Sequence, residues 1–154
     1  MNAIRNWLYI GKYRDTLDVV SLAKHNIGAV LQLAEAIQYP NIESLYLPVE
    51  DGVPIAKRHL GQGIDFTLRQ KRLGRSVLVA CGAGMSRSAV FAVAALKDGE
   101  GLGLLAALRE VKRYHPDTMI HPALWKSLCT FYQEDIPLDL AVSVMLSGKY
   151  NTHG

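Results

Sequence analysis

The residues from Cys81 to Ser88 combine a nucleophile, flexible glycines and a planar cation in one short stretch. Gly82 and Gly84 allow the backbone to bend so that several N–H groups point inward, as in turns that bind phosphate. Such a turn favours the thiolate form of a cysteine, which is the nucleophilic form. Arg87 can hold two phosphate oxygens with its guanidinium group, which a lysine cannot do. The stretch therefore predicts attack of the Cys81 sulfur on a phosphoryl group.

The segments on either side of this stretch have the pattern of a strand, a tight turn and a helix. Residues 77–80 form an apolar run bounded by Gly74 and Arg75, and residues 89–96 are helix formers and apolar residues. The first turn of a helix presents unpaired N–H groups and a partial positive charge, which bind anions. The predicted phosphate-binding residues are Gly82, Ala83, Gly84, Met85, Ser86 and Arg87.

This block resembles the loop of the cysteine-dependent protein tyrosine phosphatase superfamily, specifically that of the small, atypical dual-specificity protein phosphatases. The loop of that family reads His-Cys-x-x-Gly-x-Ser-Arg-Ser. Residues 80–88 match it everywhere except at the first position, where Ala80 replaces the histidine. Residues 8–11 resemble the opening strand of the family, residues 47–51 its acid loop and residues 64–66 its helix before the catalytic strand. The resemblance covers roughly residues 4–133.

The resemblance implies a general acid on a separate mobile loop and places it at Asp51, with Glu50 as the rival carboxylate. One carboxylate can protonate the leaving oxygen and later take a proton from the water that attacks the cysteinyl phosphate. The resemblance also implies that Ser88 donates a hydrogen bond to the sulfur of Cys81 and eases its departure. Because the family histidine orders the loop without reacting, we expect an active enzyme despite Ala80.

These roles predict a protein phosphatase that hydrolyses phosphotyrosine through a cysteinyl-phosphate intermediate. Residues 35–44 lack a long aromatic insertion, which favours a shallow pocket that also admits phosphoserine and phosphothreonine. A phosphoinositide or RNA 5′-phosphatase of the same superfamily stays open, although residues 82–86 carry no basic side chain. Two further alternatives are a sulfur-transfer or arsenate-reductase-type cysteine enzyme, which needs no acid such as Asp51, and a non-catalytic phosphate-binding module.

Strand-like segments alternate with helical ones along the chain. The expected strands span residues 7–10, 28–33, 45–47 and 77–80, and the expected helices span residues 16–26, 55–72, 87–97, 104–114 and 122–132. The alternation predicts an α/β fold with a central, mostly parallel sheet of about four to five strands flanked by helices, similar to the protein tyrosine phosphatases. The loop then lies at the carboxyl end of a strand, where such sheets bind ligands.

The length of 154 residues suits one domain, and we expect the catalytic unit to span residues 1–135. Residues 136–154 form a separate tail that is expected to be partly helical. Its apolar residues at helical spacing are Leu138, Ala141, Val142, Met145 and Leu146. This face either packs on the domain or mediates contacts, so the protein is expected to be a monomer or a dimer through the tail.

Composition limits the partners and the location. Hydrophobic residues make up 49% of the chain, but no apolar run approaches the ~20 residues of a membrane span, and the amino terminus does not resemble a secretory signal. An unpaired nucleophilic thiol fits a reducing cytoplasm. A net charge of +3 is too small to indicate a nucleic-acid partner. The histidines lack metal-ligand spacing, so we predict no metal and no cofactor, and a phosphorylated protein or peptide as the partner.

Basic residues are nevertheless bunched in three places, at residues 57–59, 69–75 and 109–115. Each bunch is either a solvated helix face or part of a basic rim that attracts phosphorylated or acidic substrates.

Overall fold

The computed structural model describes residues 1–147. The tail predicted over residues 136–154 therefore lies partly outside the described residues. In chain order the elements are β1 (Asn2–Arg5), β2 (Leu8–Lys12), a 3-10 helix η1 (Tyr13–Leu17), α1 (Val19–Lys24), β3 (Ile27–Gln32), β4 (Glu43–Tyr46), α2 (Lys57–Arg72), β5 (Ser76–Cys81), α3 (Arg87–Glu100), α4 (Leu104–Tyr114), α5 (Pro122–Tyr132) and α6 (Leu138–Ser147).

The strands form one sheet in the order β1-β2-β5-β3-β4. Strand β1 pairs antiparallel with β2, and the other neighbouring pairs are parallel. This arrangement confirms the predicted mostly parallel sheet. Strand β5 lies at its centre, between β2 and β3, so the carboxyl end of β5 is flanked by the carboxyl ends of two other strands.

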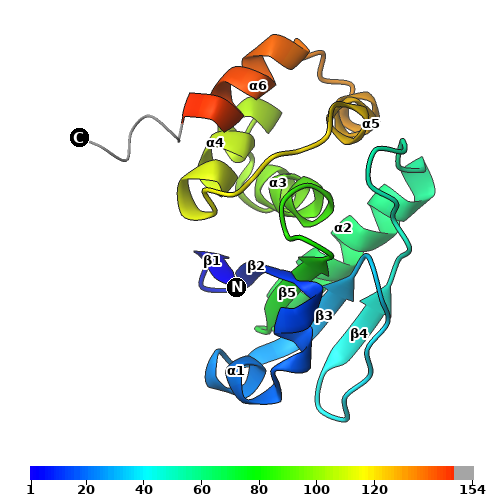
Figure 1. Ribbon diagram of the computed structural model, residues 1–154, viewed down its shortest axis with the longest axis vertical. Helices are drawn as coiled ribbons and strands as arrows, with labels where there is room; N and C mark the ends of the chain where they lie inside the picture. Colours follow the sequence, from blue (N-terminus) through cyan, green and yellow to red (C-terminus); the bar gives the residue numbers. More distant parts are fainter. Residues whose placement is uncertain (148–154) are drawn as a thin grey trace.

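The two faces of the sheet are covered very differently. Figure 1 shows α1 on one face and the layer containing α2 and α3 on the other. The core on the α2–α3 side is large and includes Val77, Val79 and Cys81 from β5. The core on the α1 side is small and includes Leu78 and Ala80. This division follows from the strand geometry, because successive side chains of a strand point to opposite faces.

Helix α3 is the centre of the larger layer. Every residue from Ser88 to Leu96 is buried, because the strands β2 and β5 and the helices α2, α4 and α5 surround the helix. Helix α2 approaches α3 closely at Gly63, where a Cβ would lie 2.3 Å from the ring of Phe91. A glycine inside a helix lowers its intrinsic stability, but this position leaves no room for a side chain.

Several local boundaries differ from the sequence predictions. Strand β1 was not predicted; it is a short edge strand that extends the sheet beyond β2. Helix α1 begins after Asp18, whose carboxylate accepts a hydrogen bond from the Ser21 N–H at 3.0 Å, and not at residue 16, where the predicted helix starts. Helix α3 does not end at Lys97 as predicted but continues to Glu100, and Gly101 follows it in the left-handed conformation.

Helix α6 packs against α4 and α5. Its buried residues are Ala141, Val144 and Met145, and the Met145 sulfur accepts a hydrogen bond from the Ile120 N–H at 3.1 Å. Leu138, Leu140 and Leu146 stay exposed. Within residues 1–147, no helix is both long enough and apolar enough to cross a membrane.

Candidate active site

The phosphate-binding loop predicted from the sequence connects the central strand β5 to the buried helix α3. Cys81 is the last residue of β5, and Ser86 is the N-cap of α3. Gly84 has a φ of +69°, and a Cβ at this position would lie 3.0 Å from the carbonyl oxygen of Gly11. The loop can therefore turn tightly against β2 only because residue 84 has no side chain.

Cys81 and Ser88 meet at the start of α3. The Cys81 sulfur lies 3.2 Å from the Ser88 hydroxyl oxygen, and the Ser88 backbone N–H donates a hydrogen bond to the sulfur at 3.4 Å. Both residues are buried. The sulfur therefore lies at the first turn of α3, in contact with both the hydroxyl and the backbone N–H of Ser88.

Arg87 connects the loop to the segment that carries the candidate acid. Its Nη1 donates a hydrogen bond to the Val49 carbonyl oxygen at 2.9 Å, and a Cβ on Gly82 would lie 2.9 Å from Nη2. The guanidinium group therefore lies next to Gly82 of the loop. Its hydrogen bond to Val49 attaches it to the segment that precedes Asp51. A planar group with several donors can keep this contact and still present further N–H groups to a phosphate.

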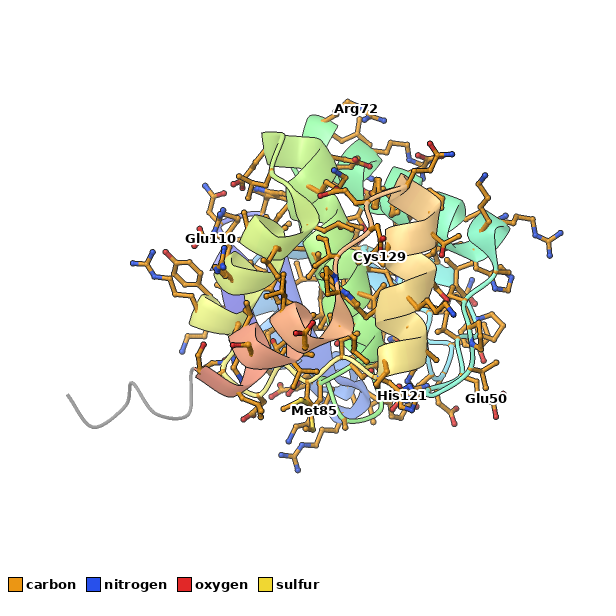
Figure 2. The ribbon with its side chains drawn as sticks, turned by 90° about the horizontal axis from the view of Figure 1, so that it is seen from above. Glu50, Arg72, Met85, Glu110, His121 and Cys129 are labelled. Atoms are coloured by element: carbon orange, nitrogen blue, oxygen red, sulfur yellow. The ribbon has the colours of Figure 1, made fainter. Side chains whose placement is uncertain are left out.

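These residues surround a small cavity of about 140 Å³. Its lining residues are Asp51, Cys81, Ala83, Met85, Ser86, Arg87 and Met119. Glu50, the rival carboxylate, does not line the cavity, and Figure 2 shows it at the outer edge of the molecule. Asp51 is exposed, so a substrate could reach its carboxyl group from solvent. Within residues 1–147, no cluster of three or more His, Cys, Asp or Glu residues could hold a metal ion.

The segment between α4 and α5 braces one side of the loop. His115 contacts the Gly84 carbonyl oxygen through Nε2 at 2.5 Å, and the Met119 N–H donates to the Met85 carbonyl oxygen at 2.9 Å. The His121 N–H donates to the Ser86 hydroxyl oxygen at 2.9 Å. Three successive loop residues, 84–86, are thus hydrogen-bonded to residues 115–121. We call this segment, residues 115–121, the brace.

The hydrogen bonds of His115 define which nitrogen carries its proton. The Gly84 carbonyl can only accept, so Nε2 must donate to it, and Nδ1 is left to accept from the Asn2 side-chain amide at 2.8 Å. Burial lowers the pKa of His115 below the 6.5 of an ordinary histidine. The ring is therefore neutral near neutral pH, which suits both of its contacts.

His121 also reaches towards the acid loop. Its Nδ1 accepts a hydrogen bond from the Ala123 N–H at 3.1 Å and so caps α5. A Cβ on Gly52 would lie 3.4 Å from its Nε2, which places the ring beside the residue that follows Asp51. Figure 2 shows His121 and Met85 near each other at one end of the molecule.

Sequence reasoning missed His115 and His121, because it considered histidines only as metal ligands. The position of His121 before Pro122 is a usable signal, since proline is common at the first position of a helix and the preceding residue is then the N-cap. No local signal identifies His115, because Gly84 and Asn2 are both distant from it in the sequence.

Ala80, the departure from the family loop, points away from the cavity. It is buried on the α1 side of the sheet, whereas Cys81 faces the α2–α3 side. Its partner on β3 is Gln32, which is also fully buried. Neither the Nε2 nor the Oε1 atom of Gln32 has a hydrogen-bond partner among the described residues.

Comparisons with known proteins agree with this geometry. Residues 8–134 match the family model described as "Dual specificity phosphatase, catalytic domain". The chain is 31% identical over 128 residues to dual specificity protein phosphatase 15 from Homo sapiens, which covers 80% of this chain and 43% of the relative. It is 30% identical over 115 residues to dual specificity protein phosphatase 22 from Homo sapiens, which covers 73% of this chain and 62% of the relative.

Among solved structures, the crystal structure of human DUSP28 superimposes with a TM-score of 0.81 at 25% identity, covering 86% of this chain and 96% of that one. The chain spans 43% and 62% of the length of the two curated relatives above. The matched region contains β5, the loop and α3, together with the acid loop and the brace. The chain therefore belongs to the dual specificity phosphatase family, through its catalytic domain.

Proposed function

We propose that the protein is a phosphoric monoester hydrolase that removes phosphate from phosphotyrosine in proteins or peptides. The observation that carries this proposal is the arrangement around the small cavity. The buried Cys81 sulfur contacts the hydroxyl and the N–H of Ser88, and Cys81, Arg87 and Asp51 line the same space. Membership of the dual specificity phosphatase family supports the same reaction.

In the first step, the Cys81 thiolate attacks phosphorus, the bond to the leaving oxygen breaks, and Asp51 gives that oxygen its proton. In the second step, water attacks the cysteinyl phosphate, Asp51 takes a proton from this water, and the electron pair of the S–P bond returns to sulfur. The Ser88 hydroxyl stabilises the departing sulfur by a hydrogen bond. Loop N–H groups and Arg87 neutralise the phosphoryl oxygens in both steps, and this accounts for much of the catalysis in a loose transition state.

Phosphoserine and phosphothreonine are proposed as further substrates, because the loop and Asp51 act on the phosphoryl group and not on the ring of tyrosine. The wall of the cavity supports this breadth, since Ala83 and Met119 are its apolar members besides Met85 and none of them is aromatic. A phosphoinositide substrate is less well supported, because residues 82–86 contain no basic side chain to bind further phosphates.

Other parts of the proposal concern the whole chain. We keep residues 1–135 as the catalytic unit and residues 136–154 as an added tail. Exposed Leu138, Leu140 and Leu146 support a role for the tail in a dimer contact. A cytoplasmic location is supported by two unpaired cysteines, Cys81 and Cys129, since a nucleophilic thiol persists in a reducing compartment.

The test compares wild type with Cys81→Ser on phosphotyrosine, phosphoserine and phosphothreonine peptides, with phosphoinositide vesicles and 5′-triphosphorylated RNA as further substrates. Wild type should hydrolyse the phosphotyrosine peptide, also in a metal chelator. Cys81→Ser should lose turnover by more than about 10³-fold, because a serine hydroxyl is far less nucleophilic near neutral pH. It should still bind the phosphopeptide, because the loop is intact. Activity of the variant within tenfold of wild type would contradict the thiolate mechanism, and hydrolysis of only lipid or RNA would change the substrate class.

A further inference from the structure

A second hollow shares loop residues with the catalytic cavity, and the brace contributes no residue to its lining. It has a volume of about 630 Å³ and is lined by Lys12, Tyr13, Arg14, Ala34, Glu35, Gly82, Ala83 and Met85. We call it the side groove. Ala83 and Met85 line both the side groove and the catalytic cavity, so the two spaces adjoin the same two loop residues.

Two cations form one wall of the side groove. Lys12 is the last residue of β2 and pairs with Cys81 of β5 in the sheet, which fixes it beside the loop. A Cβ added to Gly84 of the loop would lie 3.3 Å from the Cγ atom of Lys12. Arg14 follows in η1, and both Lys12 and Arg14 are exposed. Within residues 1–147, neither side chain has an ion pair or a hydrogen bond.

The basic residues that are bunched at positions 69–75 do not contribute to the side groove. Arg69 and Arg75 form ion pairs with Glu43 at 2.6 and 3.0 Å. Glu43 and Ser76 begin β4 and β5, so this pairing lies at the amino ends of parallel strands, whereas the loop lies at their carboxyl ends. These arginines therefore add nothing to the rim of the active site. The unpaired cations beside the loop come from the end of β2 and from η1.

We propose that the side groove binds an acidic residue that flanks the phosphorylated residue of a peptide substrate, and that Lys12 and Arg14 recognise its carboxylate. This inference rests on the proposed phosphopeptide phosphatase activity and specifies its substrate. When a phosphorylated side chain enters the catalytic cavity, the neighbouring residue of the same peptide crosses Ala83 or Met85 into the side groove. Tyr13 and Met85 supply apolar surface for the stem of that residue.

The charge of the side groove favours a peptide carboxylate over a polyphosphorylated headgroup. Glu35 lies in the same lining as Lys12 and Arg14, so the net charge of the walls is small. One carboxylate can contact the cations while Glu35 accepts hydrogen bonds from peptide N–H groups or faces a basic residue. Several phosphates in the same space would be repelled by Glu35.

The test measures kcat and KM for two matched phosphotyrosine peptides, one with aspartate on both sides of the phosphorylated residue and one with alanine there. At low salt, wild type should prefer the aspartate peptide by about threefold to tenfold through KM, the size expected for exposed charge pairs. In the double variant Lys12→Ala and Arg14→Ala this preference should vanish. Its kcat/KM for the alanine peptide and for p-nitrophenyl phosphate should stay within about twofold of wild type. In about 1 M salt, wild type should lose the preference too, because screening is then strong.

A matched control removes the same charge elsewhere. The double variant Lys24→Ala and Arg72→Ala changes two exposed cations that end α1 and α2, before the strands β3 and β5 begin, and Figure 2 shows Arg72 at the opposite end of the molecule from Met85. This control should keep the aspartate preference. Glu35→Gln should increase the preference, because a repelling carboxylate is gone.

Equal rates for the two peptides in wild type would overturn the side-groove proposal and leave the phosphatase proposal standing, whereas no hydrolysis of either peptide would contradict the phosphatase proposal itself. Loss of the preference in the Lys24 and Arg72 variant would show that only net charge matters, and would also overturn the proposal. So would a Lys12 and Arg14 variant that loses activity only on vesicles containing phosphoinositide, since the groove would then bind a lipid headgroup.

Discussion

The two flanks of the phosphate-binding loop are built in opposite ways. On one flank, the brace makes hydrogen bonds to three successive loop residues, Gly84, Met85 and Ser86. On the other flank, Lys12 and Arg14 line the side groove together with Ala83. Both are exposed, and neither side chain makes a hydrogen bond within residues 1–147. The braced flank is occupied by the segment between α4 and α5, whereas the open flank is accessible to solvent.

For the proposed reaction, the difference separates two tasks of the loop. Binding a transition state requires N–H groups held in fixed directions, because preorganised donors cost no reorganisation during the reaction. Recognition of a substrate requires surface that is free before binding. A loop braced on both flanks could not contact a peptide beside the cavity, and a loop open on both flanks would hold its donors less firmly. Variants of the centre, the braced flank and the α1 side of the sheet therefore test different steps.

The largest effect is expected at the centre, which both flanks serve. Arg87→Lys should lower kcat/KM by about 10² to 10³-fold, nearly as much as Arg87→Ala, because lysine keeps the charge but loses the planar pair of donors. Steady-state kinetics on a phosphotyrosine peptide measures this. A lysine variant that is close to wild type would mean that Arg87 serves mainly its contact with the Val49 carbonyl and does not hold the phosphate.

The acid loop is expected to give the next effect, and its size should depend on the substrate. Asp51→Asn should slow hydrolysis of a peptide phosphate by about 10² to 10⁴-fold, but slow an activated aryl phosphate far less, because a good leaving group needs no proton. Rates for both substrates in Asp51→Asn and Glu50→Gln test the assignment. A greater loss in Glu50→Gln, or equal losses on the two substrates, would move the acid to another residue.

Breaking the braced flank should cost about tenfold in kcat with a smaller change in KM. His115→Ala leaves the buried Gly84 carbonyl without its donor, which costs about 1–3 kcal/mol. His115→Gln should recover part of the activity, because a glutamine amide can also donate to this carbonyl. Neither variant should alter the aspartate preference of the side groove. Equal activity in all three proteins would show that the contact with Gly84 does not support catalysis.

The same residue predicts a pH dependence of stability. The pKa of buried His115 is lowered in the folded protein, so the unfolded chain takes up a proton first as the pH falls below 6.5. Its contribution to stability is complete above this pH and is lost as the pH falls towards the lowered pKa. The hydrogen bond to the Gly84 carbonyl and, less strongly, Asp117 oppose the lowering, while the amino terminus and Lys112 strengthen it. Melting temperatures between about pH 5 and pH 8 should therefore fall less for His115→Gln than for wild type.

The smallest effect is expected on the α1 side of the sheet. Ala80→His restores the family residue next to Gln32, whose side-chain amide has no partner among the described residues. A new hydrogen bond to Gln32 would order the end of β5, while the larger side chain costs about 1–3 kcal/mol of packing strain. We expect a change in turnover of less than about tenfold, or a shift of the acidic limb of the pH–rate profile, with the same substrates accepted.

The control for this prediction is Ala80→His in a Gln32→Ala background, where any gain in turnover should disappear. A gain that persists there would exclude Gln32 as the partner.

Much of the catalytic centre could be predicted from consecutive residues. Strand β5, the loop and the start of α3 follow one another in the chain. An apolar run, the glycines and a run of helix-forming residues therefore predict their order without reference to any distant contact. The roles of Asp51 and Ser88 came from the resemblance to a family, and the site assignments stay predictions until the variants above are measured. The local errors, at the start of α1 and the end of α3, concern boundaries that depend on which side chain caps a helix.

The sequence by itself therefore determined the mostly parallel sheet and the family, and it predicted the nucleophile with its loop. Only the tertiary structure decided that His115 and Met119 brace the loop, that Lys12 and Arg14 line its open side, and that Ala80 faces away from the cavity. The physical reason is the range of the interactions. A strand–turn–helix unit is specified by neighbours in the chain, whereas the brace and the side groove arise where β2, β3 and the segment after α4 converge on the carboxyl end of β5.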